Sequence, residues 1–289
     1  MHFKEVIQYL FFNYFYIMPY YIVKKQGDAF VKKLLNIFKK DLYPEVKKAG
    51  NLPNALDKAL EARGSSLRVM RRDADYDFPV INTHMVNNNK FSQVYIAQDV
   101  RRFLPDFWRN GVCLAQGGTD DFNLLAEAID YWLTYDVTTR QLAEKYPFIV
   151  PHEHAAAFDE GREVAYAWNR MLNTRGEHLK PIISLAMHDE VVGRLFPFTS
   201  HYTLCLSRCT GYPYDDIGLP YVTPAQFARF EDGRLIMGES EGEDGRYIVS
   251  RNRSEYLGEG NAAEALALIK LHLPPHIQPA VAGTADGLA

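Results

Sequence analysis

The spacing of hydrophobic positions changes near Gly64. Before this glycine, residues 28–40 and 51–63 place apolar side chains three and four positions apart, with lysine and other polar residues between them. That spacing is typical of amphipathic helices, and a glycine directly after the second segment is a common helix stop. We therefore expect the first sixty residues to be mainly helical.

After Gly64 the pattern becomes short hydrophobic runs separated by turns rich in Asp and Asn. The runs that we interpret as strands are residues 67–71, 80–86, 91–97 and 112–115. Turn residues between short runs of this kind are typical of strands that follow one another. We expect a small antiparallel sheet here.

Capping residues then mark the beginnings of two helices. Thr119 is placed to cap a helix whose first turn holds Asp120 and Asp121 and whose apolar face continues to residue 133. Thr138 and Gln141 form a capping-box pattern for a shorter helix that ends near residue 146.

The second half of the chain repeats the order of helices followed by strands. Two helices are expected at residues 151–172, with Gly161 as an internal weak point, and at 179–195. The strands that we expect after Pro197 are residues 201–208, 220–223, 225–230, 235–238 and 246–251. Residues 261–271 read as a closing helix, and residues 278–289 are small and polar enough to form a mobile tail.

These elements predict an α+β protein with a helical N-terminal arm and two small antiparallel sheets joined by a helical layer. We expect the arm at residues 1–50, an α+β subdomain at 51–150, the helical layer with the C-terminal sheet at 151–277, and the tail at 278–289. No internal repeat is visible.

The arm contains an uncharged segment of 18 residues, 6–23, followed by two lysines. Its length meets the minimum for a membrane span, but five tyrosines, two amide side chains and a proline would then lie in hydrocarbon. We favour a helix that packs on the body of the protein or on a second copy, which would make the arm a dimer contact. Association with a membrane surface, or a span, is the alternative.

Charge and cysteine content exclude several classes of protein. The net charge of −4 argues against nucleic acid as a partner, and the acidity is concentrated in residues 63–289, with +4 left for residues 1–62. Three cysteines are too few, and of the wrong parity, for a secreted disulfide framework. We therefore expect a cytoplasmic location.

No metal or cofactor site is predicted. His152 and His154 are two residues apart, which on a helix points them in different directions. Asp120 and Asp121 follow a glycine pair, but two carboxylates already compensate the helix dipole and would repel a phosphate. They could instead bind a divalent cation, although no third ligand is nearby.

The segment 195–214 (LFPFTSHYTLCLSRCTGYPY) is the candidate site. If it contains a strand, one face carries Thr203 and Ser207 with His201, and the other carries Leu204 and Leu206 toward the core. The polar face is either a covered sheet face with satisfied hydroxyls or a groove for a ligand or partner. Arg208 could reach Asp215 or Asp216. The candidate binding residues are His201, Tyr202, Arg208, Tyr212, Tyr214, Asp215 and Asp216, together with Asp120 and Asp121.

Several stretches resemble a bacterial family of unknown function that is usually labelled natural product biosynthesis protein. They are LFPFTSHYTLCLSRCTGYPYDDIGLPYVTP, the run Tyr256-Leu257-Gly258-Glu259, GGTDDFNLLAEAIDYWL and Trp168. The resemblance covers about residues 42–275 and implies no catalytic residues that could be transferred to this chain.

We expect a non-catalytic binding protein that acts as an immunity or accessory protein of a bacterial toxin or biosynthetic locus. Its partner would be the cognate toxin or another protein of that locus, because an acidic body attracts a basic protein. The alternative is an enzyme of secondary metabolism that acts on a small molecule through His201 and Arg208, although no Ser, Cys or Thr lies in a recognisable nucleophile context.

Overall fold

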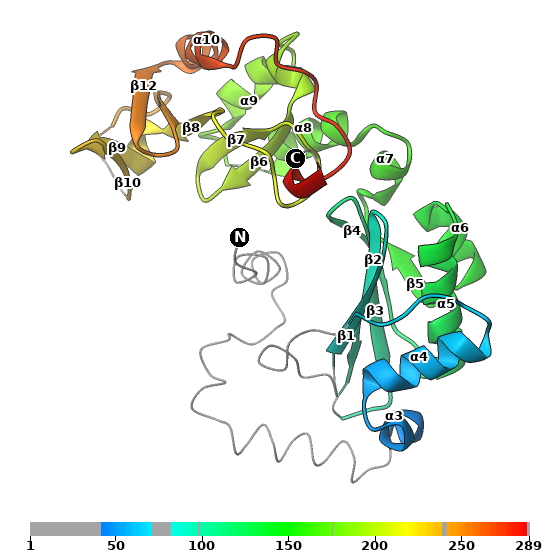
Figure 1. The fold of residues 1–289 in the computed structure, drawn as a ribbon. Coiled ribbons are helices and arrows are strands. Elements are labelled where there is room, and N and C mark those ends of the chain that lie inside the picture. The colour runs from blue at the N-terminus through cyan, green and yellow to red at the C-terminus, as the bar shows by residue number, and fades with distance from the viewer. Residues whose placement is uncertain (1–41, 71–81, 98, 175, 239–241, 288–289) are drawn as a thin grey trace, which may run out of the picture. The chain divides into compact units, whose positions relative to one another are not determined.

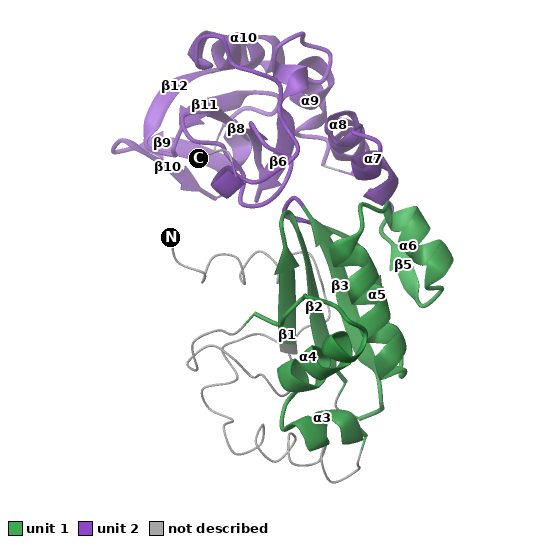
Figure 2. Cartoon of the chain, turned by 45° about the vertical axis from the view of Figure 1, so that its right-hand side comes forward, with its two compact units in different colours: residues 1–109, 113–152 green, residues 110–112, 153–289 purple. Residues whose placement is uncertain are grey.

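The computed structural model describes residues 42–70, 82–97, 99–174, 176–238 and 242–287. The expected helix at residues 28–40 and the uncharged segment 6–23 lie outside these residues. Two compact units are present: unit 1 is residues 1–109 with 113–152, and unit 2 is residues 110–112 with 153–289 (Figure 2). Each unit has its own antiparallel sheet and its own helices, which confirms the expected α+β class (Figure 1).

Unit 1 contains a five-stranded sheet in the order β1-β2-β3-β4-β5. The strands are β1 (Asn82–Asn87), β2 (Lys90–Ile96), β3 (Phe103–Arg109), β4 (Val112–Gly117) and β5 (Ile149–Pro151). Sequence reasoning missed β3 and β5. Pro105 opposes Val94 in the middle of β3, and a proline at such a position normally argues against an inner strand.

Helices cover one face of this sheet. They are α3 (Pro44–Ala49), α4 (Leu52–Ala62), α5 (Phe122–Thr134) and α6 (Thr139–Lys145). Leu56 of α4 and Trp132 of α5 are fully buried, as are Phe103 and Phe107 of β3. The alternating burial of β3 therefore directs Phe103 and Phe107 into the core and leaves Asp106 and Trp108 on the opposite face.

The predicted cap of α6 is confirmed, whereas the predicted cap of α5 is wrong. The expected capping box of α6, between Thr138 and Gln141, is present. Thr119 does not cap α5; the N-cap is Asp121, whose carboxylate accepts hydrogen bonds from the backbone of Asn123 and Leu124. Thr119 accepts the backbone N–H of Asp121 instead and so supports the capping residue.

Unit 2 contains a second five-stranded antiparallel sheet, in the order β12-β11-β8-β7-β6, and a separate hairpin. The sheet strands are β6 (Phe196–Ser200), β7 (Thr203–Ser207), β8 (Pro220–Pro224), β11 (Tyr247–Arg251) and β12 (Glu255–Gly260), and the hairpin is β9 (Ala228–Glu231) with β10 (Arg234–Met237). Single 3₁₀ turns lie at η2 (Val192–Arg194), η3 (Ala225–Phe227) and η4 (Ala285–Gly287).

The helices of unit 2 differ from the expected ones except at the closing helix, which has the expected length. They are α7 (Ala155–Asp159), α8 (Glu163–Thr174), α9 (Lys180–Ala186) and α10 (Ala262–His272). The single helix expected at 151–172 is wrong, because Gly161 has φ +68°, a left-handed conformation that ends α7 before α8 begins. The helix expected at 179–195 ends at Ala186. The strand expected at 201–208 begins only at Thr203, because His201 has φ +58° in the turn between β6 and β7.

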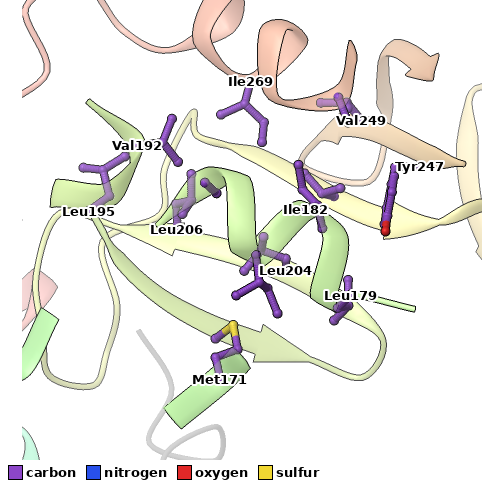
Figure 3. Close-up of a cluster of buried hydrophobic side chains, with 14 of the residues drawn as sticks. Met171, Leu179, Ile182, Val192, Leu195, Leu204, Leu206, Tyr247, Val249 and Ile269 are labelled. Carbon is purple, nitrogen blue, oxygen red and sulfur yellow. The ribbon is translucent and has the colours of Figure 1, made fainter. Parts of the chain in front are cut away.

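The core of unit 2 lies between this sheet and helices α8, α9 and α10 (Figure 3). Leu204 and Leu206 point into it from β7, as predicted, and meet Ile182 of α9 and Ile269 of α10. The opposite face of the sheet carries the polar side chains of β7.

The end of the chain is held by backbone hydrogen bonds where we expected a mobile tail. Five of them tie Ala280, Val281, Gly283 and Ala285 to residues 194 and 208–213, at distances of 2.8 to 3.0 Å. Among the described residues, no helix has both the length and the apolar character needed to cross a membrane.

Candidate functional site

The polar face of β7 is covered. Thr203, Cys205 and Ser207 are almost fully buried, and the Thr203 hydroxyl lies 2.9 Å from the hydroxyl of Thr223 on β8. Burial also raises the pKa of the Cys205 thiol to about 12, so this thiol stays protonated. The face corresponds to the covered alternative, with satisfied hydroxyls, rather than to an open groove.

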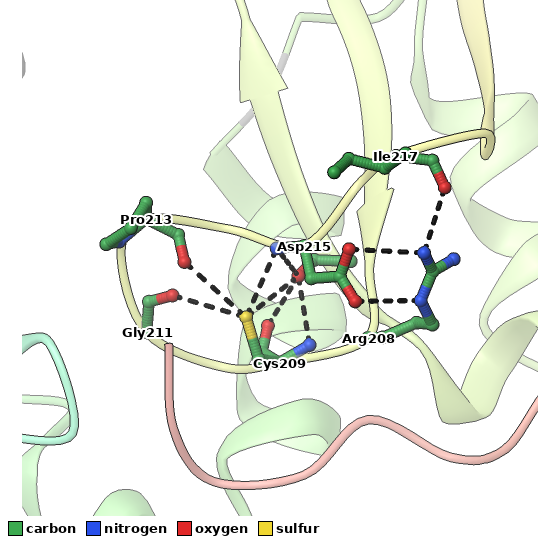
Figure 4. Close-up of polar contacts among 7 residues, drawn as sticks. Arg208, Cys209, Gly211, Pro213, Asp215 and Ile217 are labelled. Atoms are coloured by element: carbon green, nitrogen blue, oxygen red, sulfur yellow. Dashed lines mark hydrogen bonds and ion pairs between the residues drawn. The ribbon is translucent and has the colours of Figure 1, made fainter. Parts of the chain in front are cut away.

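Arg208 makes the contact that we expected with Asp215, and the contact closes a loop. Its guanidinium donates to both carboxylate oxygens of Asp215, with Nε–Oδ2 at 2.8 Å and Nη2–Oδ1 at 3.1 Å (Figure 4). Nη2 also donates to the carbonyl of Ile217 at 2.9 Å. A bidentate pair of this kind fixes geometry as well as charge, and it leaves the guanidinium engaged within its own loop.

Cys209 lies inside the same loop and is fully buried. Its sulfur accepts the backbone N–H of Asp215 at 3.2 Å and donates toward the carbonyls of Gly211 and Pro213 (Figure 4). The hydroxyl of Ser207 donates to the Cys209 carbonyl at 2.7 Å and accepts the backbone N–H of Cys209 at 3.0 Å. These contacts define the conformation of residues 207–217.

The other candidates of this segment are spread along β7 and its loops. His201 is exposed in the hairpin turn, and Tyr202 beside it is 57% exposed and stacks on Phe227 at 4.4 Å between ring centroids. His201 and Arg208 lie at opposite ends of β7. The strand between them, Thr203–Ser207, extends over about 13 Å, so β7 does not bring these two side chains together.

The aromatic and acidic candidates also contact their own unit. Tyr214 stacks on Phe198 at 4.4 Å, and Tyr212 meets the edge of Tyr214 at 5.9 Å. Asp216 accepts a hydrogen bond from the hydroxyl of Tyr221 at 2.8 Å.

Asp120 and Asp121 belong to unit 1. Asp121 is the N-cap of α5, and Asp120 offers its backbone carbonyl to Arg101. In the described ranges, no three His, Cys, Asp or Glu side chains are grouped so that they could hold a metal ion.

A pocket of about 420 Å³ that sequence reasoning missed lies between the β9–β10 hairpin and strands β11 and β12. This volume falls in the range of small-ligand sites. Its lining residues are Ala225, Ala228, Arg229, Phe230, Gly242, Ile248, Tyr256 and Glu259. The small side chains of Ala225 and Ala228 leave the space, and Ile248 of β11 is buried beside them.

A β-bulge brings the two β12 side chains into the pocket. Ser250 pairs with Tyr256, and Ile248 pairs with Glu259, with a shift of register between Val249 and Ser250. Directly paired residues point to the same face of an antiparallel sheet, so the extra residue lets Tyr256 and Glu259 share a face although they are three positions apart. Without the bulge, only one of them would reach the pocket.

The pocket has aromatic walls and a charged rim. The rings of Phe230 and Tyr256 lie 5.2 Å apart, and Tyr256 is 47% exposed. Glu259 accepts a hydrogen bond from Arg246 at 3.1 Å, and Arg229 pairs with Glu231 at 2.9 Å. Burial, with a smaller effect of Glu259, raises the pKa of Tyr256, which therefore remains a neutral hydrogen-bond donor.

A second polar group lies on the face of the unit 1 sheet opposite to helices α4 and α5. The sulfur of Cys113 is 3.6 Å from Nε2 of His152, and Asp106 is nearby on β3. A Cys–His pair suggests a nucleophile, but burial and the charge of Asp106 raise the pKa of the Cys113 thiol well above its ordinary value. The arrangement therefore opposes formation of a thiolate.

One part of the chain matches the model of a known protein family. Residues 162–284 match the model of a "Family of unknown function (DUF6193)". No curated protein and no solved structure matches the chain. The matched residues lie in unit 2 and contain both the predicted segment 195–214 and all the residues that line the pocket. The match covers less of the chain than the resemblance read from the sequence.

Proposed function

We propose that this chain is a non-catalytic binding protein and that the pocket of unit 2 is where it meets a protein partner. The pocket combines an apolar floor, two aromatic walls and a charged rim, which is the composition of a site that receives a side chain of another protein. It also lies within the residues that match a protein family.

The polar side chains of the predicted segment and those of the pocket differ in what they bind, and this difference supports the proposal. Arg208, Asp215 and Ser207 form hydrogen bonds within their own loop. Tyr256, by comparison, is half exposed at the pocket, and aromatic residues in such positions dominate the energy of many interfaces.

Charge indicates the kind of partner. Unit 2 contains 12 basic and 19 acidic residues, a net charge of −7. Glu231, Asp232, Glu243 and Asp244 are exposed close in sequence to residues that line the pocket. An acidic surface accelerates association with a basic protein. We accordingly propose a basic partner encoded beside this chain, with the chain serving as its immunity or accessory protein in the cytoplasm.

The test is co-expression of the full chain with the proteins encoded by its neighbouring genes. We expect a stable complex with a basic protein, and we expect Tyr256→Ala to raise the Kd about tenfold or more, because an aromatic anchor is lost. Tyr135→Ala, at a tyrosine of unit 1 that is 56% exposed, is the matched control and should leave the Kd unchanged.

A different result would favour an enzyme. Turnover of a small molecule that His201→Ala abolishes at an unchanged melting temperature, with no protein partner recovered, would contradict the binding proposal. Catalytic groups act as a unit, so one such change removes nearly all activity, whereas interface residues contribute graded amounts.

A further inference from the structure

Strand β12 is an edge of the unit 2 sheet, and among the described residues no strand pairs with the outer side of its backbone. It pairs with β11, and within the described chain no backbone hydrogen bond joins residues 255–260 to another strand. Alternate N–H and C=O groups of such a strand point outward and are ready to pair with a further strand.

The two edges of this sheet differ in their protection. β6, at the opposite edge, contains Pro197, a residue that natural sheets use to block pairing. β12 has a bulge and exposed side chains at Glu255, Tyr256 and Glu259, but it contains no proline, so every residue of the strand keeps a backbone N–H. Of the two edges, β12 is therefore the one whose backbone can donate along its whole length.

The pocket lies directly beside this open edge, because Tyr256 and Glu259 of β12 line it. In a strand added to β12, every second side chain would point to the pocket face. Pairing of the backbone and insertion of a side chain would thus occur together, which is the usual way in which strand addition combines affinity with specificity.

The charges near this edge favour a basic sequence for the added strand. Glu243 and Asp244 are exposed just before β11, whereas Glu255 and Glu259 of β12 already pair with Arg251 and Arg246. Because unit 2 as a whole carries a net charge of −7, a basic segment would be attracted to this edge and an acidic one would be repelled.

We propose that the partner binds by adding an extended basic strand to the β12 edge, with one large apolar side chain in the pocket. This inference rests on the proposed binding function and specifies its mode. It commits to a polypeptide segment, with lysine or arginine alternating with apolar residues, as the occupant of the edge.

The experiment uses the full chain and a fluorescent ten-residue peptide in which lysine alternates with valine and tyrosine. A second peptide has the same sequence with every backbone nitrogen methylated, so it keeps its charge but cannot donate to a strand. We expect the first peptide to bind at least about fivefold more tightly than the second, and the amides of β12 to exchange more slowly with solvent when it is bound.

Two protein variants separate strand addition from simple charge attraction. Glu255→Lys changes the edge strand itself and should weaken peptide binding about fivefold or more, because a lysine on an edge disfavours pairing. Glu153→Lys makes the same change of charge at an exposed glutamate outside β12 that also pairs with an arginine, Arg170, and should have a much smaller effect. Melting temperatures of both variants show that each is folded.

Equal binding of the two peptides, equal effects of the two variants, or no binding of the unmethylated peptide would each overturn strand addition. The proposed function has its own test in the co-expression experiment. A complex that forms there and is insensitive to Glu255→Lys would retain the binding function and reject this mode.

Discussion

Asp106 is a carboxyl group placed on β3 without a hydrogen bond to its side chain from the described residues. Burial alone raises its pKa from the ordinary range to about 6. A carboxyl whose pKa is raised in the folded state holds its proton there while the unfolded chain has already released it. Ionised Asp106 therefore destabilises unit 1, and the protein tolerates this cost at neutral pH.

The pH dependence of stability tests this interpretation. Between about pH 4 and pH 6 the folded state binds more protons than the unfolded state at this residue, so its contribution to stability falls as the pH rises and then stays constant. We expect Asp106→Asn to raise the free energy of unfolding by about 1–2 kcal/mol near pH 7.5 and by much less near pH 4.5. Urea unfolding at the two pH values measures both.

Asp120→Asn is the matched control, because Asp120 is exposed in the same unit. The interpretation would be contradicted if the two variants changed the free energy of unfolding equally, or if the gain in Asp106→Asn were the same at both pH values. Either result would mean that the pKa of Asp106 is not raised in the folded protein.

At the scale of elements, the bulge in β12 is the feature on which the pocket depends. It requires Gly258, whose φ is +145°. A Cβ atom at this position would lie 2.8 Å from Leu268 of α10. The backbone angle is one that residues with a side chain rarely adopt. The glycine therefore permits both the bulge and the close approach of α10.

Replacing this glycine should lower the stability of the protein. We expect Gly258→Ala to lower the free energy of unfolding by about 2–3 kcal/mol, from backbone strain and the contact with Leu268. Gly245→Ala is the control, since Gly245 also has a positive φ but nothing lies within 4 Å of the added atom. It should cost only about 1 kcal/mol. Thermal unfolding distinguishes the two, and equal losses would mean that the bulge is not under special constraint.

At the scale of the whole molecule, each unit has its own sheet and core, and unit 2 is completed by the end of the chain. Val281 forms a parallel bridge with Cys209, and Ala285 donates to the carbonyl of Pro213. The loop that contains the Arg208–Asp215 pair is thus held on one side by its own side chains and on the other by residues 280–285. These two sets of contacts together fix the conformation of the loop.

Removing the end of the chain should loosen this loop. Truncation after Pro279 deletes five backbone hydrogen bonds, and each contributes about 0.5–1.5 kcal/mol net. We expect unit 2 to lose about 2.5–7.5 kcal/mol and the amides of residues 208–213 to exchange faster with solvent. Truncation after Gly287 keeps all five bonds and is the control. Unchanged exchange after the longer truncation would show that the loop does not need the segment.

The sequence by itself determined the elements whose signals are local. The α+β class, the helices at 52–62, 139–145 and 262–272, and the inward direction of Leu204 and Leu206 follow from periodicity and capping within a few residues. The sequence also placed Arg208 within reach of Asp215 or Asp216, and the structure shows that Asp215 is the partner.

Only the tertiary structure decided where the open site lies. β3 is an inner strand despite Pro105, because its neighbours β2 and β4 supply partners that no local propensity reports. The pocket needs Ile248 and Tyr256 from the paired strands β11 and β12 and Phe230 from the separate β9–β10 hairpin. A shift of β12 by one residue would turn Tyr256 to the other face of the sheet. Strand pairing is a contact between distant residues, so neither the bulge at Gly258 nor the open edge of β12 could be seen in the order of amino acids alone.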